Sequence, residues 1–320
     1  MLDLQKYKKK ASKLFIYVLH IVSRFAIPVL RNIHWNVIFV INIGSTSNFH
    51  RFLPRSAATR IAESASYSSS NFPIAFIKGH NYKGLMLVNG TSNLQLSSNK
   101  SLIRDIIRDI LNYRSTRYAM GSVIPSVYRA STDTSLPKDN PDITTSHAGL
   151  IYMMYGCIQQ VSEQYSVYRL LERPIAIIGA GYSGLSLSRY LSDLGYQVNI
   201  FDIRTVDHRD SDNVNLIVNK FSDIGKSGLV ILLSTDGESG FHSIQKFLTP
   251  NMVLLSNTFP NLRQEHALTV KQRGVMCFET YTRIPGIKVY PSFFSMDPHH
   301  FGGCFIQSYL ESINNKYYIN

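Results

Sequence analysis

The 320-residue sequence is poor in cysteine, with three, and in acidic residues, with 21 against 33 lysines and arginines. Cys157, Cys277 and Cys304 lie in three separate segments. Thiols so few and so far apart exclude both a disulfide framework and the paired-cysteine spacing of zinc sites, and they favour a reducing, cytoplasmic compartment. The sequence also lacks a catalytic serine elbow and a paired-carboxylate arrangement, and we expect no metal site.

The shortage of acidic residues leaves a net charge of +12 at pH 7. Such a balance suits nucleic acid, an anionic membrane surface or small anionic ligands. Because no nucleic-acid-binding motif is found, nucleic acid is not an expected partner, and a small anionic molecule explains the charge equally well.

Part of the positive charge lies at the N-terminus, where a lysine-rich stretch from Lys6 to Lys13 precedes the apolar run from Leu14 to Val22. His20 interrupts this run and Arg24 closes it, and the run is too short to span a bilayer as a helix. We therefore interpret residues 1–30 as a basic amphipathic segment. Loose association with a membrane surface is the alternative, which adds a peripheral membrane location to the cytoplasmic one.

The stretch from Ile175 to Arg204 organises the rest of the chain. An apolar run is followed by glycines at three spaced positions, a helix-period segment to Leu194, a turn at Gly195 and a second alternating run that ends at Asp202. The pattern predicts strand, glycine turn, helix and strand, which is the dinucleotide-binding unit of the Rossmann fold.

Each residue type in this turn has a physical role. Gly179 permits the tight turn, Gly181 lets the backbone approach a pyrophosphate, and Gly184 lets the helix pack close to the strand. The pyrophosphate would lie at the positive N-terminal end of the helix, and Asp202 is placed to accept hydrogen bonds from a ribose. The predicted cofactor-binding residues in this stretch are Gly179, Gly181, Tyr182, Ser183, Gly184, Asp202 and Arg204.

The predicted cofactor is NAD, because the Asp202 carboxylate repels the 2′-phosphate of NADP. NADP is the alternative, since Arg204 follows directly and an arginine there can hold that phosphate. FAD is not expected, because FAD proteins usually begin with this unit, whereas here it starts past the midpoint of the chain.

The fold class predicted is α/β, with a doubly wound parallel sheet in the C-terminal half and a smaller N-terminal α/β domain. The expected regions are a basic segment (1–30), an N-terminal α/β substrate domain (31–146), a connecting helix (147–172, with its helical pattern from His147 to Leu171) and the dinucleotide-binding domain (173–320). The N-terminal domain is expected to contain strands at Trp35–Ile43, Pro73–Ile77 and Gly84–Asn89, and an amphipathic helix at Ser101–Tyr113. Further strands are predicted at Val214–Val218, Gly228–Ser234, Met252–Ser256, Gly274–Phe278 and Ile287–Tyr290, with a last helix to about Ile313.

The segment from about Asn140 to Tyr281 resembles the NAD domain of S-adenosylhomocysteine-hydrolase-like and formate/glycerate-type dehydrogenases. The resemblance lies in the polar loop Asn140–Ser146 and in the step Tyr155-Gly156-Cys157 before the glycine turn. It implies that Thr235 and Asn257, after the fourth and fifth strands, contact the cofactor. Where the hydrolases carry lysine and aspartate after the polar loop, this chain has Thr145, His147 and Gly149, which argues against hydrolase activity.

Hydride transfer needs a general acid or base, and histidine is the usual one because its pKa lies near neutrality. The candidate catalytic residues are His147, His299 and His300, while His242 and His266, on predicted helices, are weaker candidates. The predicted function is an NAD(P)-dependent oxidoreductase acting on a small, anionic metabolite, and a homodimer is compatible with the sequence. The alternative is a non-catalytic NAD-binding regulatory or interaction protein.

Overall fold

The computed structural model describes residues 26–42, 71–91, 95–96, 99–121, 143–144, 147–202, 220–234, 237–258, 262–291 and 297–314. The chain divides into two compact units. We call Leu150–Tyr281 the parallel-sheet unit, and Met1–Gly149 together with Thr282–Asn320 the mixed-sheet unit. The predicted basic segment before residue 26 and the predicted strand Val214–Val218 lie outside the described residues.

The parallel-sheet unit contains a five-stranded sheet in the order β10-β9-β8-β6-β7. Its strands are β6 (Ile175–Ile178), β7 (Val198–Phe201), β8 (Leu229–Leu232), β9 (Val253–Ser256) and β10 (Met276–Glu279), and every pairing is parallel. The chain goes from β6 to β7 on one side and then to β8 on the other. The direction of strand order therefore reverses between β6 and β8, and in doubly wound folds ligands bind at the carboxyl end of the strands at this point.

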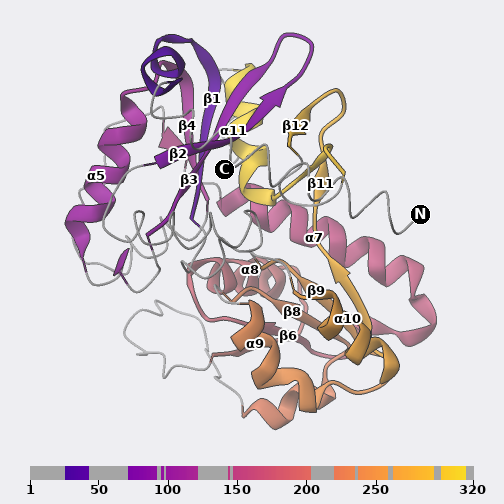
Figure 1. Ribbon diagram of the computed structural model, residues 1–320. Coiled ribbons are helices and arrows are strands. Elements are labelled where there is room, and N and C mark those ends of the chain that lie inside the picture. Colours follow the sequence, from indigo (N-terminus) through magenta and orange to yellow (C-terminus); the bar gives the residue numbers. More distant parts are fainter. Residues whose placement is uncertain are drawn as a thin grey trace. The chain divides into compact units, whose positions relative to one another are not determined.

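Helices cover both faces of this sheet, as parallel strands require. Alternate residues of the strands, such as Ile178, Val230 and Leu254, join one core with Phe241 and Ile244 of helix α9 (Gly237–Ile244). Helix α10 (Gln264–Gln272) contributes Val270 to the same core. Figure 1 shows α8 (Tyr182–Asp193) on the opposite side of the sheet from α9.

The connecting helix is shorter than the sequence predicts. Helix α7 runs from His147 to Gln164 and is followed by two 3-10 turns, Ser166–Tyr168 and Leu170–Glu172. Between them Arg169 has a left-handed backbone with φ 47°, which an α-helix cannot contain. The prediction of a continuous helix to Leu171 is therefore wrong. The chain turns so that Leu170 becomes buried, whereas Val167 stays 80% exposed.

The mixed-sheet unit contains a six-stranded sheet in the order β12-β2-β3-β1-β4-β5. Its strands are β1 (Trp35–Asn42), β2 (Asn71–Lys78), β3 (Lys83–Asn89), β4 (Ser115–Met120), β5 (Ile143–Thr144) and β12 (Lys288–Tyr290). Strand β1 pairs in parallel with β3 and β4, whereas β2 runs antiparallel to β3. The structure confirms the α/β fold class and the three N-terminal strands predicted.

Helix α5 (Lys100–Leu111) is the amphipathic helix predicted at Ser101–Tyr113. Its residues Ile103, Ile106 and Ile110 are fully buried and pack in one core with Ile38 and Val40 of β1. On the other face of β1 the ring of Phe39 contacts Phe305, with centroids 5.5 Å apart. Phe305 belongs to α11 (Gly303–Asn314), so α5 and α11 cover opposite faces of the sheet, as Figure 1 shows.

The C-terminal segment differs from the sequence-based division, which placed all of 173–320 in the dinucleotide-binding domain. The parallel-sheet unit ends at Tyr281, and the chain after it belongs to the mixed-sheet unit. There β12 pairs antiparallel with β2, with Val289 opposite Ile77, and the short strands β11 (Thr282–Arg283) and β13 (His300–Phe301) pair with each other. Backbone pairing and the aromatic packing of α11 thus hold this segment against the six-stranded sheet.

Among the helices that the structure describes, none combines the length and the apolar character needed to cross a bilayer.

Candidate functional site

The turn between β6 and α8 has the geometry that a close-approaching ligand needs. Gly179 has φ +115°, and a Cβ atom there would lie 3.2 Å from the backbone of Leu233, so conformation and space both require glycine. A Cβ at Gly184 would overlap the carbonyl oxygen of Gly179, so α8 starts directly against the turn.

Gly181 is different, because a Cβ there would meet nothing within 4 Å. Its backbone has φ −74° and ψ 178°, which any residue adopts. Neither strain nor packing within the described residues explains a glycine at this position. It leaves a shallow hollow over the backbone where α8 begins, and Gly181, as the N-cap of α8, provides no side chain to satisfy the first N–H groups of the helix. Such an end of a helix attracts a negatively charged group.

Asp202 follows β7 and faces this turn. Its Oδ2 accepts a hydrogen bond of 2.8 Å from the backbone N–H of Ala180. The carboxylate is thereby held beside the glycine turn, at the carboxyl end of the sheet. Tyr182, Ser183 and Gly184 form the first turn of α8. The structure therefore brings these predicted cofactor-binding residues together with Gly179, Gly181 and Asp202.

The carboxyl ends of β8 and β9 supply small polar groups to the same edge of the sheet. Asn257 donates its backbone N–H to Leu232, at 3.0 Å, and its Nδ2 to Oγ1 of Thr280, at 2.7 Å. The hydroxyls of Ser256 and Thr258 lie 3.2 Å apart and are buried. Asn257 is thus fixed at this edge by Thr280, the residue that follows β10, a contact that the sequence does not reveal. Arg204 and Thr235 lie outside the described residues.

The predicted catalytic histidines all belong to the mixed-sheet unit. His147 is the first residue of α7. Nδ1 of His299 lies 2.9 Å from the carbonyl oxygen of Ile287, and the backbone N–H of His299 donates to Asp297. These contacts give His299 a role in holding the turn at Asp297 that precedes β13 against Ile287, which precedes β12.

His300 lies in a group of charged side chains. Its Nε2 is 3.4 Å from a carboxylate oxygen of Asp297 and 3.4 Å from Nε of Arg283, which is its cross-strand neighbour in the β11–β13 pair. Arg283 also forms an ion pair with Asp297. Burial lowers the pKa of His300, although the Asp297 carboxylate opposes this effect. The hydrogen bond from the His299 N–H and that from Arg283 lower the pKa of Asp297. A neutral imidazole therefore stands beside a carboxylate and a guanidinium.

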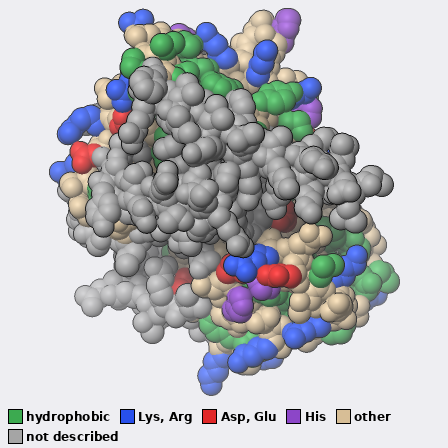
Figure 2. Space-filling view, viewed as in Figure 1, with side chains coloured by type: hydrophobic (Ala, Val, Ile, Leu, Met, Phe, Trp, Pro, Cys, Tyr) green, Lys and Arg blue, Asp and Glu red, His purple; other side chains and the backbone are tan. Residues whose placement is uncertain are grey.

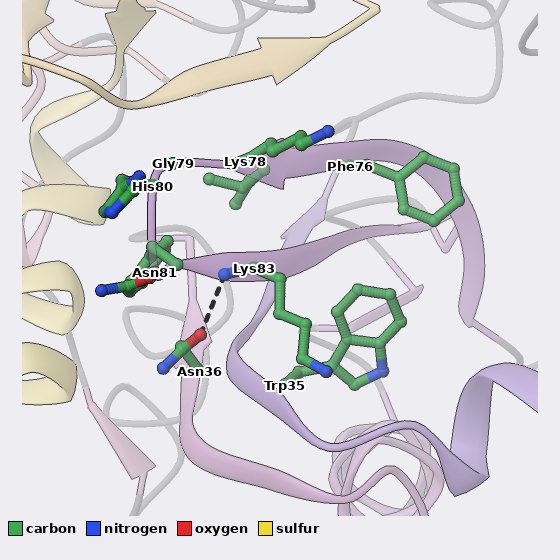
Figure 3. Close-up of a pocket in the computed structure, with 10 residues that line it drawn as sticks. Trp35, Asn36, Phe76, Lys78, Gly79, His80, Asn81 and Lys83 are labelled. Atoms are coloured by element: carbon green, nitrogen blue, oxygen red, sulfur yellow. Dashed lines mark hydrogen bonds between the residues drawn. The ribbon is translucent and has the colours of Figure 1, made fainter.

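The mixed-sheet unit also has an open cavity of about 610 Å³, lined by residues from Trp35 and Asn36 and from the β2–β3 hairpin. Figure 3 shows the rings of Trp35 and Phe76 beside it, and the bond that the backbone N–H of Lys83 donates to Asn36. Both β1 and β3 begin at this end. Because ligands of parallel sheets bind at the carboxyl ends of the strands, we do not assign this cavity as the substrate site.

A row of buried asparagines lies at the other end of the same sheet. Asn42, Asn89 and Asn71 are register neighbours on β1, β3 and β2. Asn89 donates to Asn71 at 3.2 Å, and Asn42 donates to the carbonyl of Thr91 at 2.6 Å. Sequence reasoning did not single out this row. Its bonds tie the strand ends together, which gives it a structural role.

A further cluster combines two helices of the parallel-sheet unit. Glu238 and His242 lie one turn apart on α9, and His266 lies on α10, with one possible metal-ligating atom of each within 4.8 Å of the others. Sequence reasoning finds no metal-ligand spacing here, because only the pair on α9 is local. Figure 2 shows histidines beside acidic and basic side chains on the visible face of the molecule.

Comparison with known proteins gives only distant likenesses. No protein-family model matches the chain, and no curated protein sequence does. Among solved structures, L-tryptophan dehydrogenase from Nostoc punctiforme is 14% identical, with 87% of this chain and 75% of that chain covered and a TM-score of 0.39. A chorismate mutase/shikimate 5-dehydrogenase fusion protein from Clostridium acetobutylicum is 10% identical, with 77% and 86% covered and a TM-score of 0.37.

An NADPH-dependent glyoxylate/hydroxypyruvate reductase from Sinorhizobium meliloti is 12% identical, with 55% of this chain and 84% of that chain covered and a TM-score of 0.31. TM-scores of this size transfer neither a fold nor an activity. The fold class therefore rests on the strand order and pairing of this chain itself.

Proposed function

We propose that this chain is an NAD(P)-dependent oxidoreductase that acts on a small, anionic metabolite. The observation that carries the proposal is the open position over Gly181 at the N-terminus of α8. It lies between Gly179 and Gly184, two positions that require glycine. A pyrophosphate fits such a position, because backbone N–H groups and the helix dipole meet it there without a side chain in the way.

Asp202 supports a dinucleotide in particular. A ribose attached to that pyrophosphate would extend toward the end of β7, where the Asp202 carboxylate can accept its hydroxyl hydrogens. The bond from Ala180 N–H holds the carboxylate in place. Because a carboxylate repels a 2′-phosphate, NAD is the preferred cofactor, and NADP is the alternative if Arg204 shields that charge. When bound, the nicotinamide supplies or accepts the hydride.

His300 is the proposed acid–base group. Its lowered pKa keeps the imidazole neutral at pH 7, so it can accept a proton from a substrate hydroxyl. The Asp297 carboxylate stabilises the imidazolium that forms, and Arg283, 70% exposed, provides a cation for an anionic substrate group. We prefer His300 to His299, because the main chain at Ile287 already binds one ring nitrogen of His299.

Turnover tests this proposal directly. The full-length chain is assayed for oxidation of NADH and NADPH at 340 nm with a panel of 2-oxo acids. We expect turnover with at least one of them and a loss of turnover in the His300→Gln variant. The control is His34→Ala, at an exposed histidine that bonds to Thr116, and its turnover should equal that of wild type. Tight cofactor binding with no turnover across the panel would instead identify a non-catalytic NAD-binding protein.

A further inference from the structure

We propose that Glu238, His242 and His266 form a binding site for a transition-metal cation of the zinc type. The site uses residues to which the proposed function gives no role. One carboxylate and two imidazoles are the oxygen and nitrogen ligands that zinc accepts, and three protein ligands leave a fourth position open.

The distances are close to those of a coordination sphere. The three ligand atoms already lie within 4.8 Å of one another. Ligands at about 2.1 Å from a tetrahedral zinc lie about 3.4 Å apart. Since His242 is exposed, small rotations of its side chain suffice to close the remaining gap without moving the two helices.

The surroundings orient both imidazoles as metal ligands. Nδ1 of His242 lies 2.7 Å from the carbonyl oxygen of Glu238. A proton on Nδ1 donates to that carbonyl and leaves Nε2 as the unprotonated, metal-binding nitrogen, which is the arrangement that orients metal-bound histidines. The ring of His266 stacks on the fully buried Phe241, with centroids 4.8 Å apart and planes at 29°. Its orientation is therefore fixed by packing.

Charge favours a cation at this point. Nε2 of His266 donates a hydrogen bond to Oε2 of Glu238, and these side chains are only 17% and 22% exposed. A cation would take the place of the proton between the two atoms, and the neutral imidazole would then carry its proton on Nδ1. Arg263 now lies near the same carboxylate, with its Nε 3.5 Å from Oε1. It is 59% exposed and also pairs with Glu265, so it can move away.

The arrangement predicts how substitutions change affinity. His242→Ala removes a ligand, but it leaves the bond between His266 and Glu238 intact. It should weaken zinc binding at least about tenfold. His266→Gln should weaken binding to a similar degree. Arg263→Gln removes a competing cation and should tighten binding. His80→Ala, at an exposed histidine of the other unit, is the matched control and should change nothing.

The test is a titration of the full-length chain with Zn²⁺ against a chromophoric chelator, repeated with Co²⁺ to record the absorption bands of the bound ion. We expect one tight site and the order of affinities given above. The proposal is overturned if the wild-type chain has no tight site, if His242→Ala binds as tightly as wild type, or if His80→Ala weakens binding as much as His242→Ala. A normal zinc result with no turnover in the oxidoreductase assay would separate this site from the proposed function.

Discussion

Two alanine substitutions in the glycine turn, two residues apart, should have opposite effects. At Gly179 alanine would have to adopt φ +115° with its Cβ 3.2 Å from the backbone of Leu233. A residue forced into such a backbone costs about 1–3 kcal/mol. At Gly181 the backbone is ordinary and the Cβ meets nothing within 4 Å. Gly181→Ala should therefore leave stability unchanged or raise it by about 0.4–1 kcal/mol, through the reduced freedom of the unfolded chain.

Gly181→Ala, the substitution that should not harm stability, should weaken dinucleotide binding. The methyl group of Gly181→Ala fills the hollow at the start of α8, so affinity for a dinucleotide should fall at least about tenfold, or about 1.4 kcal/mol. The assays are urea unfolding for stability and calorimetric titration for affinity, on both variants and wild type. A Gly181→Ala protein that is as destabilised as Gly179→Ala would refute the account of the turn. One that is stable and binds the dinucleotide as wild type does would refute the account of the hollow.

Three other predictions address the cofactor, the core and the thiols. Asp202→Asn keeps an acceptor for the Ala180 N–H but loses the charge, so the ratio of NAD to NADP affinity, measured calorimetrically, should fall toward one; an unchanged ratio would show that another residue selects the cofactor. Phe241→Ala removes a fully buried ring and should lower the free energy of unfolding by about 3–5 kcal/mol, and a loss under about 1 kcal/mol in urea titration would contradict its place in the core. Burial raises the pKa of Cys157 and of Cys277 to about 11, which leaves little thiolate at pH 8. Both thiols should therefore react with iodoacetamide much more slowly in the native than in the urea-unfolded chain. Equal reaction rates, measured by mass spectrometry, would contradict this.

The local parts of the structure could be predicted from the sequence because their signals are local. The strand β6, the glycine turn and the start of α8 lie within one short stretch, where φ dictates Gly179 and close packing dictates Gly184. The same holds for α5, whose apolar residues recur on one helical face.

Contacts between distant segments could not be predicted in this way. The pairing of β12 with β2 depends on main-chain hydrogen bonds that leave no mark on the side-chain pattern of Lys288–Tyr290. For the same reason the C-terminal segment was assigned to the wrong unit. The partner of Asn257 is Thr280, which directly follows the neighbouring strand β10, and the third member of the Glu238 cluster is His266 on the next helix. Such groups become visible only when packing brings their elements together.

The most direct measurement of the central claim is a calorimetric titration of the full-length chain with NAD, NADH, NADP and FAD in turn. We expect the nicotinamide dinucleotides to bind at one site, NAD and NADH to bind more tightly than NADP, and FAD not to bind. If none of the four binds, or if FAD alone does, the turn between β6 and α8 is not a nicotinamide dinucleotide site and the proposed function is wrong.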